Sequence, residues 1–340
     1  MPLVTMRQLL DEAAAGGYGV AAFNVNNMEQ IQGIMEAAQE TQSPVIVQAS
    51  RGARSYAGDR FLYHMMLAAT ETYPDIPVAL HQDHGNSPET CISAIELGFT
   101  SVMMDGSLAE DGKTPLDFED NVAVTKKVVE YAHERGVTVE GELGTLGGIE
   151  DGVGSGEICL TDPEQAEEFV ARTGVDALAV AIGTSHGAYK FSREPDGDIL
   201  AMEIIEDIHR RLPDTHIVMH GSSSVPADIV ARVKAAGGEV DAGFGVPIHA
   251  IQRGIEHGVR KVNIDTDGRL AITAFMREHY KNKPGDWDPR GPGKAARAGQ
   301  KLICAQRMQE LGMAGHAKDY EPMSLQQMAA RYAAGVGTPA

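Results

Sequence analysis

The run His81-Gln82-Asp83-His84-Gly85 carries the residues best suited to chemistry in this sequence. Two imidazoles and a carboxylate so close together can ligate a metal ion or transfer protons. The apolar residues 77–80 before the run predict a buried strand, and the residues after it predict a loop. Side chains alternate along a strand, so Asp83 and His84 should point in different directions, one toward a substrate and the other toward a metal. A hydrogen-bonded structural His–Asp pair is the alternative.

Two further histidines, His186 and His220, also follow apolar segments, and each is directly followed by glycine, as His84 is. Three imidazole nitrogens with one open position are typical of a catalytic rather than a structural zinc site. Because the three lie far apart in the sequence, only the fold could bring them together. His81 could orient one of the ligands. The histidines on predicted helix surfaces or ends are expected to be solvated: His133, His209, His257, His279 and His316.

A candidate phosphate site follows His220, where Gly221-Ser222-Ser223-Ser224 leads into a predicted helix that starts near Pro226. Backbone N–H groups and hydroxyls at a helix N-terminus can bind phosphate. Barrels favour phosphate sites after their seventh and eighth strands, and the loop 183–190 adds the cation Lys190. Ordinary serine capping of a helix is the alternative. The adjacent candidate metal ligand favours a phosphorylated substrate bound at the metal.

Eight apolar, strand-like segments must position these residues, and helix-like segments separate them. Near-continuous apolar character is typical of strands buried on both faces. Eight strands that each precede a helix predict an α/β protein with a (β/α)8 TIM barrel, whose sites lie at the carboxyl ends of the strands. An open doubly wound sheet is the alternative, but no GxGxxG follows the first strand. The predicted strand ends carry Asn24, Ser50, Asp83, His84, Asp105, Glu142, His186, His220, Asn263 and Asp265.

We expect residues 1–282 to form the barrel catalytic domain and residues 283–340 a C-terminal helical extension that packs on the barrel or on a partner subunit. The glycine-rich segment 141–156 is long for a connector, and long loops in compact domains often act as lids. The segment 237–258 inserts an extra turn and helix before the last strand.

Composition narrows the function. The 340 residues are 43% hydrophobic and carry a net charge of −19, which argues against a general nucleic-acid or membrane-surface binder. Three scattered cysteines without a CxxC spacing predict reduced thiols rather than disulfides. No apolar run approaches membrane-spanning length and the N-terminal residues do not look like a signal peptide, so we expect a cytoplasmic protein.

Six segments spread over nearly the whole chain form a specific pattern: HQDHG (81–85), EGELGTLGG followed by IEDG (140–152), GTSHGAYK (183–190), HGSSS (220–224), NIDTD (263–267) and DPR (288–290). The pattern closely resembles the class II, metal-dependent fructose-1,6-bisphosphate aldolases. The segments 19–27 and 237–258 are similar to the Calvin-cycle subtype, whose members often also cleave sedoheptulose 1,7-bisphosphate.

The resemblance implies a lyase of glycolysis, gluconeogenesis and the Calvin cycle that reversibly cleaves fructose 1,6-bisphosphate to dihydroxyacetone phosphate and glyceraldehyde 3-phosphate. By family pattern, His84, His186 and His220 hold the catalytic Zn2+. Asp83 is the acid/base on the oxygen of the aldehyde half, and Glu150 handles the carbon-bound proton of the other half.

The resemblance also assigns the surroundings. Glu142 is an alternate metal ligand and Asp105 supports the metal site, with a second divalent site expected near the two. The dihydroxyacetone-phosphate end is bound, beside a monovalent cation (Na+ or K+), by Gly187, Lys190, Gly221, Ser222, Ser223, Asn263, Asp265 and Thr266. Asn24 contacts the substrate. Ser50 and Arg290 match positions that bind the far phosphate, the arginine reaching in from a neighbouring subunit of a homodimer or larger homo-oligomer.

Three alternatives stay open. Another class II ketose-bisphosphate aldolase, such as one for tagatose bisphosphate, would share the metal-binding half. A Schiff-base aldolase needs a lysine at a strand end, where none is predicted, since Lys190 lies on a loop. A barrel metallohydrolase commonly has an HxH on its first strand, where this chain has Asn24-Val25-Asn26.

Overall fold

Eight parallel strands form a closed barrel, in which each strand pairs with the next along the chain and β8 closes onto β1. The computed structural model of the protein describes residues 3–111, 113–145, 159–186, 191, 195, 199–241 and 243–335. All residues of the strands are buried, as their apolar character predicts. The predicted TIM barrel is confirmed. The strands are β1 (Val20–Asn24), β2 (Val45–Ser50), β3 (Val78–Gly85), β4 (Ser101–Met104), β5 (Thr138–Leu143), β6 (Ala177–Val180), β7 (His216–Met219) and β8 (Val259–Ile264).

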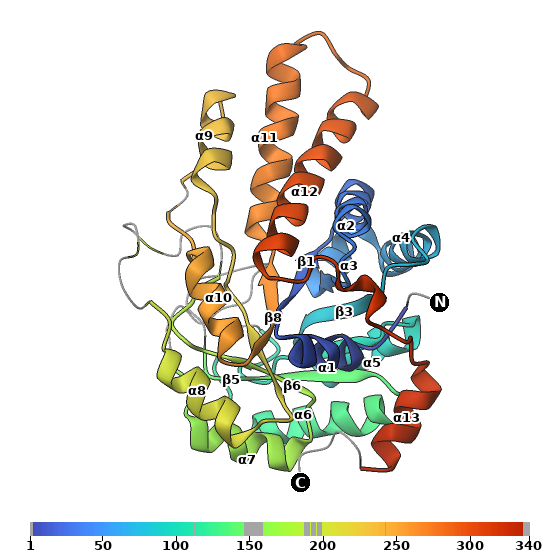
Figure 1. Cartoon of the computed structure of the whole chain (residues 1–340), viewed down its shortest axis with the longest axis vertical. Helices are drawn as coiled ribbons and strands as arrows, with labels where there is room; N and C mark the ends of the chain where they lie inside the picture. The colour runs from blue at the N-terminus through green and yellow to red at the C-terminus, as the bar shows by residue number, and fades with distance from the viewer. Residues whose placement is uncertain are drawn as a thin grey trace.

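Helices surround the barrel (Figure 1). The first part of the chain supplies α1 (Met6–Gly16), α2 (Met28–Thr41), α3 (Arg51–Ala57), α4 (Asp59–Thr72), α5 (Pro88–Leu97), α6 (Phe118–His133) and α7 (Pro163–Thr173). The rest supplies α8 (Met202–Arg211), α9 (Ala227–Ala235), α10 (Ile248–Glu256), α11 (Thr266–Asn282), α12 (Arg290–Glu310) and α13 (Leu325–Ala333). The helix expected within 237–258 is α10, whereas the short α3 directly after β2 was not anticipated.

The sequence encodes helix ends in a way that α5 illustrates. The side chain of Ser87 accepts a hydrogen bond from the backbone N–H of Thr90, and Pro88 occupies the first turn, where its missing N–H costs nothing. Gly98 ends the helix at φ 112°, a left-handed conformation that glycine adopts without strain. These signals fix where α5 begins after β3, directly beyond the histidine-rich run.

Polar side chains two residues apart share one face of a strand, and on β5 and β8 this face points into the barrel. Glu140 of β5 and Lys261 of β8 form a 2.8 Å ion pair although their strands are not neighbours, so the pair crosses the barrel interior. Glu142 and Asn263 follow two residues later, nearer the carboxyl ends of the strands. The barrel therefore has a buried ionic layer below its mouth.

His84 departs from strand geometry. Its φ is +48°, which is rare for a residue with a side chain, and the pairing of β3 with β4 shifts register between Gln82 and Gly85. Such irregularities at the end of a strand re-aim side chains. Simple alternation would turn Asp83 and His84 to opposite faces of the strand, but both side chains line the same pocket at the mouth of the barrel.

The C-terminal helices pack outside the barrel on the same chain. The helix α12 lies against α2 and α11, and α13 contacts α6 (Figure 1). The guanidinium of Arg307 on α12 reaches the buried carboxylate of Asp267 on α11 at 2.9 Å. The division of the chain at residue 282 stays a prediction. None of the helices within the described residues has the length and apolar character needed to cross a membrane.

The expectation that five histidines are solvated is wrong for two of them. Nε2 of His133 lies 3.0 Å from the carboxylate of Asp176, and the ring stacks on Tyr332 of α13 at 3.8 Å between ring centroids. His279 pairs with Asp286 at 2.7 Å, and both imidazole side chains are only 12% exposed. The other three, His209, His257 and His316, are half-buried.

Candidate active site

The three histidines singled out in the sequence meet at the mouth of the barrel. His84, His186 and His220 are buried, and each offers one ligand atom such that all three atoms lie within 4.8 Å of one another. Nε2 of His84 and Nδ1 of His220 are 3.1 Å apart. This spacing suits three imidazoles that share one metal ion.

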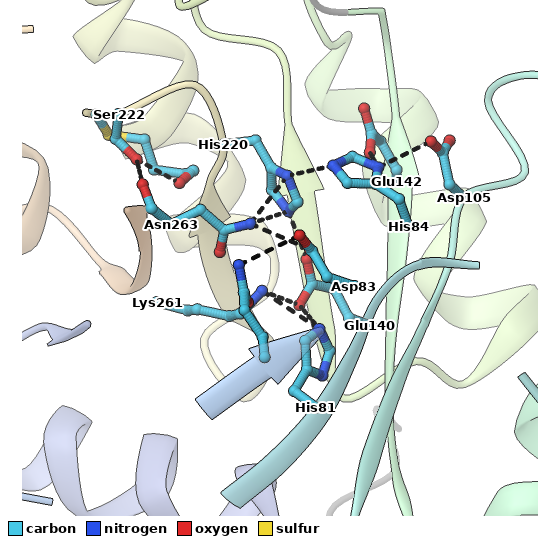
Figure 2. Close-up of polar contacts among 12 residues, drawn as sticks. His81, Asp83, His84, Asp105, Glu140, Glu142, His220, Ser222, Lys261 and Asn263 are labelled. Atoms are coloured by element: carbon cyan, nitrogen blue, oxygen red, sulfur yellow. Dashed lines mark hydrogen bonds and ion pairs between the residues drawn. The ribbon is translucent and has the colours of Figure 1, made fainter. Parts of the chain in front are cut away.

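A second group of potential ligands adjoins the first through His84. Asp105 and Glu142 lie with His84 in a buried cluster whose ligand atoms are also within 4.8 Å of one another (Figure 2). The Nδ1 atom of His84 is 3.1 Å from Asp105 and 4.0 Å from Glu142. Oε2 of Glu142 is buried and makes no hydrogen bond within the described residues. That acceptor is oriented for a cation rather than for a protein donor.

The charges of this cluster shift its pKa values in opposite directions. Burial alone would lower the pKa of His84, but Asp83, Asp105 and Glu142 outweigh it and raise the pKa to about 10. Burial, reinforced by the charge of Asp105, raises the pKa of Glu142 well above its usual range. Burial and the positive charges of His84 and Lys261 push the pKa of His220 far down. Negative charge is in excess around His84, so a divalent cation fits the cluster.

The carboxylate of Asp83 faces the same pocket and is held by three side-chain amides. Asn24 and Gln48 donate to Oδ2, each at 3.2 Å, and Asn263 donates to Oδ1 at 3.3 Å. Gln48 also donates to Asn24 at 2.6 Å, which fixes the orientation of both amides. The arrangement fixes Asp83 beside the histidines without tying it to a lysine or arginine of the described chain. Sequence reasoning missed Gln48, although a glutamine in the apolar segment Val45–Ser50 was a signal.

A charged layer lies beneath this group (Figure 2). Nε2 of His220 lies 2.8 Å from Glu140, whose other oxygen accepts from Nζ of Lys261 at 2.8 Å. His81 completes the layer, with Nε2 at 3.4 Å from Nζ of Lys261. The sequence analysis predicted no lysine at a strand end and did not single out Lys261, which lies inside the barrel on β8. It is fully buried, bonded to Glu140, and not among the residues that line the pocket.

The pocket above the histidines has a volume of about 490 Å³, the space open to solvent included. One side is formed after β7 and β8 and the other after β1 and β2. Arg51 is the one arginine or lysine among the described lining residues, and the sequence analysis did not single it out. The lining residues are Asn24, Ser50, Arg51, Gly52, Asp83, His84, His186, His220, Gly221, Ser222, Ser223, Asn263 and Asp265.

The serine loop differs from the phosphate cradle expected at a helix N-terminus. The helix α9 begins only at Ala227, and Asp267 accepts the backbone N–H groups of Ser224 and Val225 at 3.2 and 2.8 Å. Those two donors are therefore engaged by a buried carboxylate. The part of the loop that reaches the pocket is Gly221, Ser222 and Ser223.

Individual side chains of this loop are also partly used. The hydroxyl of Ser222 lies 2.7 Å from the carbonyl of Met219 and 2.9 Å from that of Asn263, which links the ends of β7 and β8. Ser223 accepts from the N–H of Asp265 at 3.3 Å. Thr266 is the first residue of α11 and is buried, but it does not line the pocket.

Besides Thr266, four predicted residues are not placed at the site by the described structure. Glu150, Gly187 and Lys190 lie outside the described residues. Arg290 begins α12 at the tip of the α11–α12 hairpin (Figure 1), where it is exposed and paired with Asp288. It does not line the pocket of its own chain.

A closed barrel with imidazoles and carboxylates converging at its mouth defines a TIM-barrel enzyme with a candidate metal centre. Residues 4–316 match the family model for class-II fructose-bisphosphate aldolase. A fructose-bisphosphate aldolase of Nostoc commune is 59% identical over 98% of this chain and 97% of its own length. The plasmid fructose-bisphosphate aldolase of Cupriavidus necator is 57% identical over 98% of this chain and 100% of its own length.

Solved structures agree with this result. The YdjI aldolase of Escherichia coli K12 superposes with a TM-score of 0.73 at 28% identity, over 93% of this chain and 100% of that chain. The chain belongs to the class II fructose-bisphosphate aldolase family, as its motifs indicate. It is a lyase, and its reaction is the reversible cleavage of fructose 1,6-bisphosphate.

Proposed function

We propose that His84, His186 and His220 hold a catalytic zinc ion. The convergence of their three buried ligand atoms within 4.8 Å is the observation that carries the proposal. Imidazole nitrogens suit zinc, and three protein ligands leave a position for substrate. The excess of carboxylates that raises the pKa of His84 to about 10 supports a cation at this place. Glu142 and Asp105 would form an alternate or second divalent site next to it.

Zinc in this position would supply Lewis acidity, which stabilises negative charge on the carbonyl half of the substrate without an imine. Asp83 transfers the proton at the oxygen of the aldehyde half, a role supported by its place in the pocket and its three amide donors. Glu150 moves the carbon-bound proton of the dihydroxyacetone-phosphate half. Its position in the glycine-rich segment 141–156 would let it arrive with the substrate and exclude water.

The two phosphates would lie on opposite sides of the pocket. Gly221, Ser222 and Ser223 after β7 and Asp265 after β8 support one phosphate site, since they share one wall. We assign this wall to the dihydroxyacetone-phosphate end, together with Gly187, Lys190, Asn263, Thr266 and a monovalent cation.

The other wall carries Ser50 at the end of β2 and Arg51 directly after it, and Asn24 of β1 lines the same pocket and donates to Asp83. Ser50 and Arg290 from a neighbouring subunit would bind the far phosphate. Arg51 adds a cation from the same chain. Arg290 is exposed at the start of α12, which is compatible with binding in a partner's pocket. This role of Arg290 requires a homodimer or a larger homo-oligomer.

The resemblance to the Calvin-cycle subtype suggests a physiological role for the enzyme. We propose that the enzyme works in the cytoplasm and serves the Calvin cycle as well as glycolysis and gluconeogenesis, with sedoheptulose 1,7-bisphosphate as a second substrate. Both bisphosphates share the half that would bind at the metal. A tagatose-bisphosphate aldolase is the alternative, because it too would use this half. Steady-state rates with the three bisphosphates, on protein of known metal content, distinguish these substrates.

The metal-based reaction is tested with chelator and borohydride. A chelator should abolish cleavage of fructose 1,6-bisphosphate, and added Zn2+ should restore it, whereas borohydride with substrate should leave the activity unchanged. Inactivation by borohydride would instead indicate an imine on a lysine, and Lys261→Met would then identify whether the buried lysine forms it. Full activity in metal-free protein would refute the zinc proposal.

A further inference from the structure

The ion pair of Glu140 and Lys261 lies inside the barrel, directly beneath the candidate metal ligands (Figure 2). Both side chains are fully buried. Desolvation makes a buried ion pair a weak source of stability, so such a pair in a barrel interior calls for another explanation. Its contacts suggest one. Glu140 spans from the ammonium of Lys261 to the ring of His220, with 2.8 Å at each end.

The two ring nitrogens of His220 have different surroundings. Nε2 faces Oε1 of Glu140 at 2.8 Å, whereas Nδ1 lies 3.1 Å from Nε2 of His84. The amide nitrogen of Asn263 lies near both, at 3.1 Å from Nδ1 and 3.3 Å from Nε2, so the carboxylate is the contact that distinguishes the two nitrogens. His84 is itself held from behind, since its Nδ1 is 3.1 Å from Asp105. In both rings one nitrogen contacts a carboxylate and the other points toward the neighbouring imidazole. The two inward nitrogens are the ones available to a metal.

A carboxylate only accepts hydrogen bonds, so its contact with Nε2 of His220 requires a hydrogen on that nitrogen. The lone pair of the neutral ring then resides on Nδ1. We propose that Glu140, with its charge balanced by Lys261, is a positioning residue that commits His220 to binding the metal through Nδ1. This inference rests on the proposed function in one respect, namely that His220 is a metal ligand.

Lys261 has a definite part in this arrangement. An isolated carboxylate in the barrel interior would be strongly disfavoured, and the ammonium group compensates it. Lys261 is held by Glu140 and His81, and Nδ1 of His81 is anchored to Ser101 at 2.7 Å. The layer therefore fixes both the charge and the location of the acceptor under His220.

Two double variants separate positioning from the mere presence of a buried charge. E140M/K261M replaces the pair by apolar side chains, an exchange that proteins often tolerate. E140Q/K261M also removes both charges but keeps an amide oxygen that can accept the Nε2 hydrogen. The two variants differ only in the acceptor. Asp176→Asn is the control, because Asp176 is equally buried and bonded to a histidine at the other end of the barrel.

The measurement is the dissociation constant of Zn2+, obtained by competition with a chromophoric chelator, together with thermal unfolding of the metal-free proteins. We expect E140M/K261M to bind zinc roughly 10–100-fold more weakly than wild type. E140Q/K261M should recover a large part of the affinity, and Asp176→Asn should retain it all. Equal zinc affinity of the two double variants would overturn the inference.

A second measurement needs no variant. In histidine-labelled, metal-free wild-type protein, nitrogen chemical shifts report which ring nitrogen of His220 carries the hydrogen. The Nε2–H form is expected, and the Nδ1–H form would overturn the inference. His220→Ala tests the premise separately: unchanged zinc affinity in that variant would refute the proposed zinc ligand set, whatever the double variants do.

Discussion

Both ends of the barrel bury histidines beside carboxylates, but the two ends balance charge differently. At the amino-terminal end, Asp11 contacts Arg7, His216 and Arg331, each within 2.9 Å. At the carboxyl-terminal mouth, Asp83, Asp105 and Glu142 pair with no lysine or arginine of the described residues. The amino-terminal cluster is thus compensated by the protein itself, whereas the mouth is left with negative charge that a metal ion would neutralise.

The comparison separates structural from functional histidines on physical grounds. His133 at the amino-terminal end has one carboxylate partner, Asp176, and stacks on an aromatic ring. Arg7 lies 3.5 Å from the same carboxylate. His84 at the mouth has three carboxylates nearby, and none of the three pairs with an arginine or lysine of the described residues. Burial and a carboxylate neighbour are common to both. The uncompensated charge is the distinguishing feature.

Substitution of Asp83 should give the largest effect at the mouth. Asp83→Ala is expected to lower kcat roughly 10²–10⁴-fold in both directions, because it removes a proton-transfer group, while zinc stays bound. Metal analysis and steady-state kinetics check this. Gln48→Leu is the matched variant, since it removes an amide donor to Asp83 but no acid/base group. Loss of zinc from Asp83→Ala would assign Asp83 a structural role instead.

At the amino-terminal end of the barrel, we expect a substitution to lower stability and to leave activity unchanged. Asp176→Ala should lower the free energy of unfolding by roughly 3–5 kcal/mol, because it leaves His133 and Arg7 without their buried partner. Denaturant unfolding measures this loss. Activity of the folded variant should stay at the wild-type level, and a large fall in kcat without loss of stability would erase the distinction between the two ends.

Arg51 tests whether the second wall of the pocket binds a phosphate. Arg51→Gln should lower kcat/KM for fructose 1,6-bisphosphate roughly 10–100-fold, as expected for loss of a hydrogen bond to a charged group. Fructose 1-phosphate lacks the far phosphate, so its kcat/KM should not change. Arg51→Lys should recover part of the loss. Equal losses with both sugars would place Arg51 outside the far phosphate site.

The smallest expected effect is a loss of stability on acid titration, from Asp11 at the amino-terminal end of the barrel. Burial would raise the pKa of Asp11, but the hydrogen bond from His216 and the charges of Arg7 and Arg331 lower it to about 2. Its contribution to stability is therefore present above about pH 4 and is lost as the pH falls toward about 2.

This contribution amounts to about 2 kcal/mol. The difference in unfolding free energy between wild type and Asp11→Asn should shrink by that amount over this pH range. Chemical denaturation at several pH values provides the measurement, with Asp75→Asn, which alters an exposed carboxylate, as the control. A constant difference would contradict the low pKa.

The barrel was predictable because its strands are apolar and its helices begin and end at recognisable residues such as Ser87 and Gly98. Given a barrel, the convergence of His84, His186 and His220 followed from their places after strands. The layer of Glu140 and Lys261 was not predictable in this way. Their pairing joins β5 to β8 across the interior, and no spacing in the sequence announces a contact between non-adjacent strands.

Other omissions have the same origin. Arg51 was passed over because α3, which begins with it directly after β2, was not anticipated. Asp267 belongs to the NIDTD segment, yet its contact with the serine loop depends on how α11 leaves the barrel. Glu150 and Lys190 remain predictions from the family pattern.

The carboxylate of Asp267 is shared between the backbone of the serine loop and Arg307 of α12. A chain truncated after residue 282 would therefore lose more than a surface helix. It would leave Asp267 as an uncompensated anion in the interior, immediately behind the loop proposed to receive a phosphate. Residues 283–340 therefore support the catalytic face through Arg307, and they could not be removed to give a minimal barrel.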